Sequence, residues 1–145
     1  MELKIKLLSP NAVLPRYATP GSAAMDLIAC IDESVTIAPR QLVTLPTGIA
    51  IALPSAEYVA LVFARSGLGV KHGISLSNGV GVIDSDYRGE IKVGLTNLSD
   101  EPYTIQPGDR VAQLAVLPVT QATVVQVSEL DETGRGAGGF GSTGK

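Results

Sequence analysis

The sequence predicts an all-β domain of the sandwich or barrel type, on two observations. Sixteen Gly and nine Pro interrupt the 145 residues so often that few windows could hold a helix of ordinary length. Between these breaks, apolar residues recur at every second position or form short dense runs, as in strands covered on one face or on both. Many short strands joined by turns are typical of sandwiches and barrels.

Strands are predicted along most of the chain. Alternating apolar positions predict half-buried strands, and dense apolar runs bounded by Gly or Pro predict strands that are buried on both faces. The former are centred on Leu3/Ile5/Leu7, Val35/Ile37, Ile91/Val93/Leu95 and Val125/Val127, and the latter span residues 48–53, 58–64 and 111–117.

Two windows argue for helix or leave the choice open. Ala24, Leu27, Ile28 and Ile31 lie at helical spacing, and no Gly or Pro interrupts residues 22–38. This pattern fits a helix and a strand equally well. Residues 66–71 are expected to form a short helical turn, although the glycines within it weaken that expectation.

Length and charge narrow the classes of function. A chain of 145 residues fits one domain. Eleven Lys and Arg against fourteen Asp and Glu give a net charge of −3, so we expect neither nucleic acid nor a membrane as a partner. No signal peptide is apparent, no apolar run approaches the ~18 residues of a membrane span, and Cys30 is the single cysteine. A cytoplasmic protein is therefore expected.

The C-terminal segment from Gly134 onward is rich in glycine and has no apolar face apart from Phe140. We expect a mobile tail there, not a strand. Its end, Gly139–Lys145, nearly matches the phosphate loop G-x-x-x-x-G-K-[ST], but the chain stops before the final Ser or Thr and no helix follows. Backbone amides of a glycine-rich segment, with Arg135 and Lys145, could still bind an anion. A plain disordered terminus is the alternative.

Residues 77–90 place Asp84, Asp86 and Tyr87 in a turn between apolar segments. The flanking residues 73–82 and 89–95 are expected to be the arms of a β-hairpin. Asp and Gly could equally be there only to build the turn.

Two further segments could bind an anionic ligand. Arg65 follows a predicted buried strand and precedes Ser66 and Gly67, which fits a phosphate clamp or simply an exposed arginine. Gln113 lies within an apolar strand, where its amide needs a ligand or a cross-strand hydrogen bond. The sole histidine, His72, has no evident carboxylate partner for a catalytic triad.

Together these segments resemble the five motifs of the trimeric dUTP pyrophosphatase (dUTPase) family, in order and in separation. The matching segments are Gly21–Leu27, Ala64–Gly69, Asn78–Glu90, Gly108–Leu114 and Arg135–Ser142. The resemblance implies a jelly-roll-like subunit, with Asp26 on a strand, in a homotrimer with shared active sites. It also implies a β-rich domain at 1–130 with a flexible C-terminal lid at 131–145.

The resemblance implies hydrolysis of dUTP to dUMP and pyrophosphate by attack of water on the α-phosphorus. This reaction would limit uracil incorporation into DNA and supply dUMP for thymidylate synthesis. Asp84 matches the catalytic aspartate, which takes a proton from water and meets the 3′-hydroxyl. Asp26 matches the acid of the first motif, which orients water around Mg²⁺ or the basic groups nearby. Mg²⁺ is expected on the substrate phosphates, with no direct protein ligand.

The resemblance also implies which residues bind the substrate. Contacts with the phosphates are expected from Arg65, Ser66, Gly67 and Gln113, and contacts with the γ-phosphate from Arg135 and the tail amides, including Gly141 and Ser142. Phe140 is expected to stack on the uracil ring when the tail closes. Backbone groups of the hairpin and Asn78 would pair with uracil, and Tyr87 would pack on the deoxyribose, where a ribose 2′-hydroxyl would collide.

The sequence departs from the commoner family pattern at two positions. Ala64 stands where the family usually has Pro, and Gly67 stands where Ser is frequent. Two other functions compete with dUTP hydrolysis. The related dCTP deaminases need a glutamate in the hairpin region, whereas this chain has Ile83–Tyr87 there. A non-catalytic nucleotide sensor would keep the pocket without turnover, which the combination of Asp84, Arg135 and Phe140 argues against.

Overall fold

The computed structural model describes residues 1–140 and confirms the all-β prediction. This part of the chain forms twelve strands and one short helix, in the order β1 (Lys4–Leu7), β2 (Arg16–Tyr17), β3 (Met25–Ile28), β4 (Val35–Ile37), β5 (Leu42–Pro46), β6 (Ile49–Ala52), β7 (Tyr58–Phe63), α1 (Ser66–His72), β8 (Ile74–Leu76), β9 (Gly81–Ile83), β10 (Lys92–Asn97), β11 (Tyr103–Ile105) and β12 (Arg110–Pro118).

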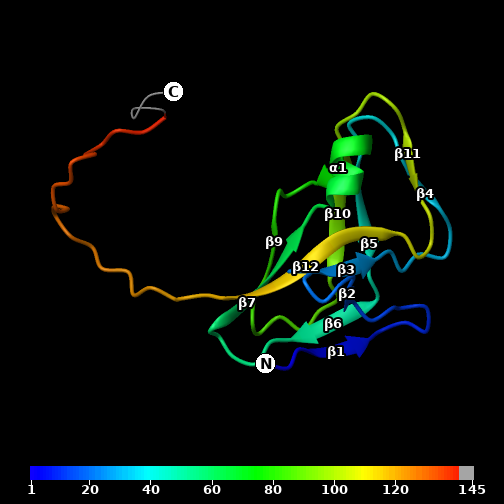
Figure 1. Cartoon of the computed structure of the whole chain (residues 1–145), viewed down its shortest axis with the longest axis horizontal. Coiled ribbons are helices and arrows are strands. Elements are labelled where there is room, and N and C mark those ends of the chain that lie inside the picture. Colours follow the sequence, from blue (N-terminus) through cyan, green and yellow to red (C-terminus); the bar gives the residue numbers. More distant parts are fainter. Residues whose placement is uncertain (141–145) are drawn as a thin grey trace.

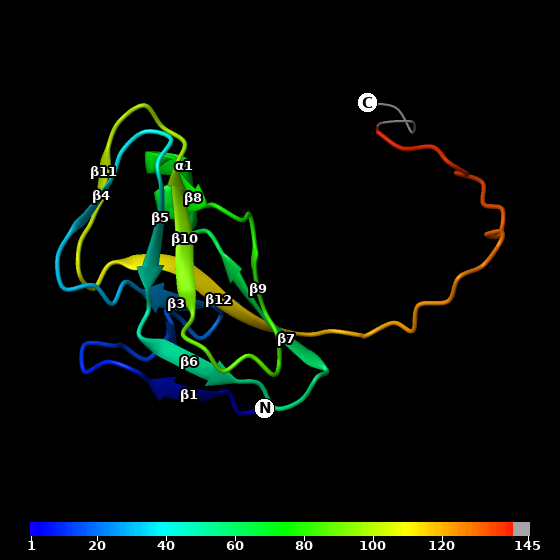
Figure 2. The same ribbon diagram turned by 180° about the vertical axis from the view of Figure 1, so that it is seen from behind.

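The strands form two main sheets and two small ribbons (Figures 1 and 2). The larger sheet has the order β2-β3-β12-β7-β9, and the smaller has the order β5-β10-β8. The ribbon β11-β4 extends at one end of the molecule and the ribbon β1-β6 lies at the other. Every strand pair is antiparallel, as expected for short strands joined by turns.

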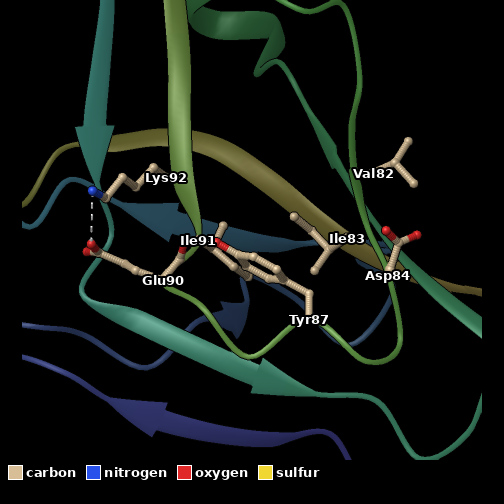
Figure 3. Close-up of a pocket in the computed structure, with 7 residues that line it drawn as sticks. All are labelled: Val82, Ile83, Asp84, Tyr87, Glu90, Ile91 and Lys92. Carbon is tan, nitrogen blue, oxygen red and sulfur yellow. Dashed lines mark hydrogen bonds and ion pairs between the residues drawn. The ribbon is translucent and has the colours of Figure 1, made fainter.

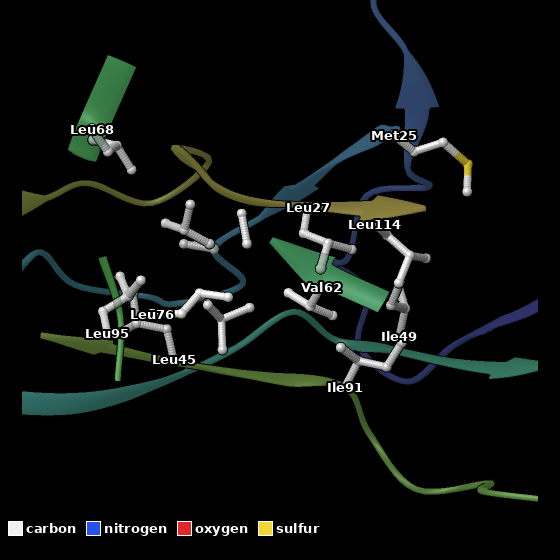
Figure 4. Packing of buried hydrophobic residues seen from close by; sticks show 14 of the residues in the cluster. Met25, Leu27, Leu45, Ile49, Val62, Leu68, Leu76, Ile91, Leu95 and Leu114 are labelled. Atoms are coloured by element: carbon white, nitrogen blue, oxygen red, sulfur yellow. The ribbon is translucent and has the colours of Figure 1, made fainter. Parts of the chain in front are cut away.

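The hydrophobic core lies between the two main sheets (Figure 4). The larger sheet contributes Leu27, Val62 and Leu114, each no more than 4% exposed. The smaller sheet contributes Leu76 and Leu95 from the opposite side. Full burial of one such side chain stabilises the fold by ~1.5–3 kcal/mol. The core therefore fixes the two sheets against each other and so positions the loops that leave them.

The two ambiguous windows have clear outcomes. Residues 25–28 are the strand β3, in which three consecutive residues, Met25 to Leu27, are buried. Burial on both faces removes the alternation of a half-buried strand, which explains why the pattern also fitted a helix. The expected helical turn is α1, fixed to the core by Leu68. It ends at Gly73, whose φ of 67° is the left-handed conformation that stops a helix.

Two strand predictions are wrong in whole or in part. Within residues 119–140 there is no strand, and Val125 and Val127 are 71% and 57% exposed. These valines have no neighbouring strand to pair with, so their alternation alone does not produce one. The predicted hairpin also holds only in part: β8 pairs with β10, but β9 pairs with β7 in the other sheet.

After β12 the chain leaves the body and runs away from it (Figures 1 and 2). Among residues 1–140, no helix is both long and apolar enough to cross a membrane.

Candidate active site

Three charged residues from separate parts of the chain meet beside the larger sheet, and we call them the arginine cluster: Asp26, Arg65 and Arg110. Oδ1 of Asp26 lies 3.2 Å from Nε of Arg65, and Oδ2 lies 3.2 Å from Nη1 of Arg110. Nη1 of Arg65 also donates a hydrogen bond to the carbonyl of Arg110 at 2.9 Å. The Asp26 side chain is only 11% exposed, so its charge is compensated mainly by these two guanidinium groups.

The fold brings the first, second and fourth sequence segments together at this cluster. In the larger sheet Gln113 of β12 lies between Asp26 on β3 and Phe63 on β7. Arg65 follows the end of β7 and directly precedes Ser66, the first residue of α1. Gln113 is half-buried, and the cross-strand hydrogen bond considered for its amide is not found within residues 1–140. Its amide is therefore free to meet a ligand.

Ala64 and Gly67, the two departures from the commoner family pattern, do not distort the backbone of the second segment. Arg65 has an extended conformation, with φ of −87° and ψ of 133°, after Ala64. Nothing lies within 4 Å of a Cβ atom built at Gly67, so a serine would fit there as well. Ser66 and Gly67 are both exposed.

A pocket opens where the predicted hairpin divides between the two sheets. β9 carries Val82 and Ile83 to the larger sheet, while Ile91 and Lys92 lead into β10 of the smaller one. Strand β10 pairs with β8 only from Leu95 onward. Between the two strands, backbone edges remain without a partner strand in the described structure, so their donors and acceptors are available to a ligand.

Asp84 and Tyr87 line this pocket, which has a volume of about 400 Å³ (Figure 3). The remaining lining residues are Val82, Ile83, Glu90, Ile91 and Lys92. Figure 3 shows the Tyr87 ring between Ile91 and Ile83, with the Asp84 carboxylate beyond Ile83. Asp84 is exposed, and Tyr87 is 44% exposed. The pocket thus combines an aromatic face with a carboxylate that water can reach. Asn78 is also exposed, in the turn between β8 and β9.

Arg65 and Asp84 lie at opposite ends of β7. Ile83 of β9 pairs with Ala60, so Asp84 lies beside the beginning of β7, whereas Arg65 follows its end. The backbone between Val59 and Arg65 spans roughly 20 Å at about 3.3 Å per residue. Within one chain, the pocket and the arginine cluster are therefore two separate half-sites.

The tail residues lie away from both half-sites. Arg135 is exposed and donates a hydrogen bond from Nε to the carbonyl of Gly138 at 2.9 Å. Phe140 is fully exposed, with φ of 48°. Gly141 and Ser142, which the sequence places in the same site, lie outside the described residues. The structure therefore brings Asp26, Arg65 and Gln113 together, and Asp84 and Tyr87 together, but not the tail.

Sequence reasoning missed the contributions of Arg110 and Glu90. Arg110 was visible only as part of a motif, because its partner Asp26 lies 84 positions earlier in the chain. Glu90 accepts a hydrogen bond from the Gly48 amide at 2.9 Å and lies 3.8 Å from Nζ of Lys92. In the sequence, the only sign of a role for Glu90 was its position directly after Tyr87, Arg88 and Gly89.

The placement of Mg²⁺ on the substrate phosphates stays a prediction. Among residues 1–140, no group of three or more His, Cys, Asp or Glu side chains is arranged to hold a metal. Asp26, the carboxylate considered for orienting metal-bound water, has both oxygens facing arginines. This pairing favours the alternative that Asp26 orients the basic groups.

Comparison with known sequences identifies relatives over almost the whole chain. The family model described as dUTPase matches residues 10–144. A deoxyuridine 5′-triphosphate nucleotidohydrolase of Desulfitobacterium hafniense (strain DSM 10664 / DCB-2) is 58% identical over 131 residues, covering 90% of this chain and 87% of the relative. The enzyme of the same name from Idiomarina loihiensis is 55% identical over 148 residues, covering 99% and 98%.

Solved structures show the same fold. The dUTPase of Staphylococcus bacteriophage 80alpha, with dUpNHpp, superposes with a TM-score of 0.89 at 28% identity and covers 99% of both chains. A mutant dUTPase from phage phi11 of S. aureus, described with a structural Mg(II) ion, has a TM-score of 0.79 at 26% identity. It covers 89% of this chain and 98% of that chain.

Proposed function

The chain belongs to the dUTPase family, and from this membership and the two half-sites we propose that it hydrolyses dUTP to dUMP and pyrophosphate. The observation that carries this proposal is the pocket in which the Asp84 carboxylate and the Tyr87 ring lie together, between strand edges without partners. The strand edges can meet a base, the Tyr87 ring can meet a sugar, and the Asp84 carboxylate can meet an α-phosphate with its attacking water.

In the proposed reaction, Asp84 acts as the general base. A water molecule attacks the α-phosphorus, a new P–O bond forms, and the bond from this phosphorus to the oxygen bridging to the β-phosphate breaks. Asp84 accepts the proton of the water, and pyrophosphate leaves with the electron pair of the broken bond. A general base contributes typically ~10²–10⁴-fold to the rate. The same carboxylate would meet the 3′-hydroxyl group of the sugar.

Phosphate binding is assigned to the side of the larger sheet that holds Arg65. Arg65, Ser66, Gly67 and Gln113 supply donors there, and Asp26 orients Arg65. Nε of Arg65 is buried beside Oδ1 of Asp26, so this contact fixes the orientation of the guanidinium group. The other N–H donors of Arg65 can form charge-assisted hydrogen bonds with phosphate oxygens. Positioning and charge stabilisation of this kind account for most of the catalysis in phosphoryl transfer.

Mg²⁺ bound to the triphosphate would neutralise part of its charge and orient its oxygens. We propose that the substrate phosphates and water hold the ion and that no protein side chain is a direct ligand. This is consistent with the pairing of Asp26 with arginines.

Selectivity for uracil is proposed to come from the separated strands β9 and β10, with assistance from Asn78. Their free backbone donors and acceptors can match the uracil edge, whereas cytosine would leave buried groups unpaired. Packing of Tyr87 on the deoxyribose would exclude a ribose 2′-hydroxyl.

The separation of the half-sites supports a homotrimer with shared active sites. Because Arg65 and Asp84 of one chain are roughly 20 Å apart along β7, one complete site needs Asp84 from one subunit and Arg65 from another. Closed symmetric rings provide such sites. The segment 131–145 is proposed as a lid, in which Arg135, Gly141 and Ser142 approach the γ-phosphate and Phe140 stacks on the uracil.

The product dUMP would feed thymidylate synthesis, and removal of dUTP would limit uracil in DNA. The cytoplasmic location, and the absence of nucleic-acid and membrane partners, stay predictions from the sequence.

The decisive experiment measures the products formed from dUTP, dCTP and UTP with Mg²⁺. We expect pyrophosphate and dUMP from dUTP, and much slower release from dCTP and UTP. Ammonia released from dCTP would instead identify a deaminase. Tight binding of dUTP without turnover would identify a nucleotide sensor.

A further inference from the structure

The ring of Tyr87 lies directly over the backbone of Gly89. A Cβ atom built at Gly89 would lie 2.6 Å from Cζ of Tyr87 and 3.0 Å from Cε2, and closer still to the hydroxyl oxygen. Carbon atoms in favourable contact lie about 3.5–4.0 Å apart. Gly89 is not among the residues with a positive φ. This position therefore requires the absence of a side chain, and not the conformational freedom of glycine.

The hydroxyl group of Tyr87 is fixed by Glu90, which directly follows Gly89. It donates a hydrogen bond to the backbone carbonyl of Glu90 at 3.0 Å. Glu90 is itself held, because its Oε1 accepts a hydrogen bond from the amide of Gly48 at 2.9 Å. The following amide, of Ile91, donates to the carbonyl of Ile49, also at 2.9 Å. The tyrosine is thus connected to strand β6 through a short, well-bonded segment.

An aromatic side chain that is partly exposed can usually choose among several staggered rotamers. Tyr87 is 44% exposed, so the pocket wall alone does not confine it. The close approach to Gly89 and the hydrogen bond to Glu90 together select one orientation, in which the ring faces the pocket (Figure 3).

We propose that Gly89 and the Glu90 carbonyl are positioning elements for sugar selectivity, because they hold Tyr87 in the orientation that excludes a ribonucleotide. This inference rests on the proposed function, in which Tyr87 packs against the deoxyribose. Gly89 acts through Tyr87 and needs no contact with the substrate. A methyl group at position 89 would tilt the ring and open space for a 2′-hydroxyl.

A double-mutant cycle tests this inference. The measured quantity is the ratio of kcat/KM for dUTP to kcat/KM for UTP in Gly89→Ala, Tyr87→Ala and the double variant. We expect each single variant to lower the ratio about tenfold or more. The double variant should match Tyr87→Ala within about twofold, because a residue that acts only through Tyr87 has no effect once the ring is gone.

Two further variants separate positioning from general damage. Val124→Ala is the control, since Val124 is 95% exposed and lies outside the five motif segments and the segment 131–145, and it should keep the wild-type ratio. Tyr87→Phe keeps the ring but loses the hydrogen bond to Glu90, so the ratio should fall severalfold even if Gly89→Ala folds poorly. A wild-type ratio in Gly89→Ala, or full additivity in the double variant, overturns the inference.

The position of the ring can be measured without any turnover. Nuclear Overhauser effects between the Tyr87 ring protons and the Gly89 α-protons should be present in the wild-type protein. Their absence overturns the positioning role. If they are present but the wild-type protein does not hydrolyse dUTP, the proposed function is wrong while the restraint on Tyr87 stands.

Discussion

Oδ1 of Asp26 lies 3.2 Å from Nε of Arg65, and the two atoms form an ion pair without an aligned hydrogen bond. The contact compensates the buried charge of Asp26 and fixes the orientation of the arginine side chain. In the proposed function, this orientation prepares Arg65 for the substrate phosphates.

Asp26→Asn should lower the free energy of unfolding by about 1–3 kcal/mol, because it removes the charge that compensates two arginines. The KM for dUTP should also rise as Arg65 loses its orientation. Urea denaturation and steady-state kinetics measure the two effects. Asp100→Asn is the control: its ion pair with Arg40 is largely exposed, and its loss should cost at most about 1 kcal/mol. Equal stability of the Asp26 variant and the wild type would contradict the role of the cluster.

Asp84→Asn should bind dUTP with little change and lower kcat by about 10²–10⁴-fold, the usual contribution of a general base. Calorimetric titration with dUpNHpp and a pyrophosphate-release assay would separate binding from turnover. Asp86→Asn, which changes a neighbouring exposed carboxylate, should keep most of the activity. Near wild-type turnover in Asp84→Asn would remove this residue from the mechanism.

Mixing two inactive variants should restore activity if each site is shared between chains. In trimers reassembled from equal amounts of Asp84→Asn and Arg65→Ala chains, about a quarter of the sites would combine an intact Asp84 with an intact Arg65. Sites built within one chain would all stay defective. Activity after co-refolding is the measurement, and each variant refolded alone is the control. An active monomer near 15.0 kDa by light scattering would also refute the shared site.

Truncation after Leu130 should leave a folded protein with little activity. Among residues 1–140 the last strand ends at Pro118, and Leu130 is 85% exposed, so residues 131–140 contribute little to the core. Ordering of the tail costs roughly 1–2 kcal/mol of backbone entropy per residue, which contacts with the nucleotide must offset. Limited proteolysis of the full chain should therefore slow when dUpNHpp and Mg²⁺ are added. Full activity of the truncated protein would show that the tail is only a terminus.

Gly48→Ala should destabilise the fold by at least about 2 kcal/mol, because it adds a clash to an unfavourable backbone conformation. Gly48 has φ of 68°, and an added Cβ would lie 2.7 Å from Cβ of Ala12 and 2.8 Å from Sγ of Cys30. Gly79→Ala is the matched control, since its φ is 75° but nothing lies within 4 Å. Thermal unfolding of both variants would separate the clash from the backbone strain. Equal losses would show that the clash contributes nothing.

The sequence predicted local features well and relations between distant segments poorly. Alternation and dense runs located most strands, because side-chain burial leaves a direct trace in the order of residues. The meeting of Asp26 with Arg110 leaves no such trace, since it depends on the pairing of β3 with β12. The division of the predicted hairpin between two sheets was equally invisible, although it creates the pocket around Asp84 and Tyr87.

The placement of Arg65 and Asp84 at opposite ends of β7 has a genetic consequence if the sites are shared. In a cell that makes an altered and an unaltered copy of this chain, a defect at Arg65 would disable sites that take their Asp84 from unaltered subunits. Each such chain would disable one site, so activity would fall only in proportion to the altered chains. A chain altered at both Arg65 and Asp84 would disable two sites in an assembly with unaltered subunits, so its effect would exceed its proportion and it would act as a dominant inhibitor.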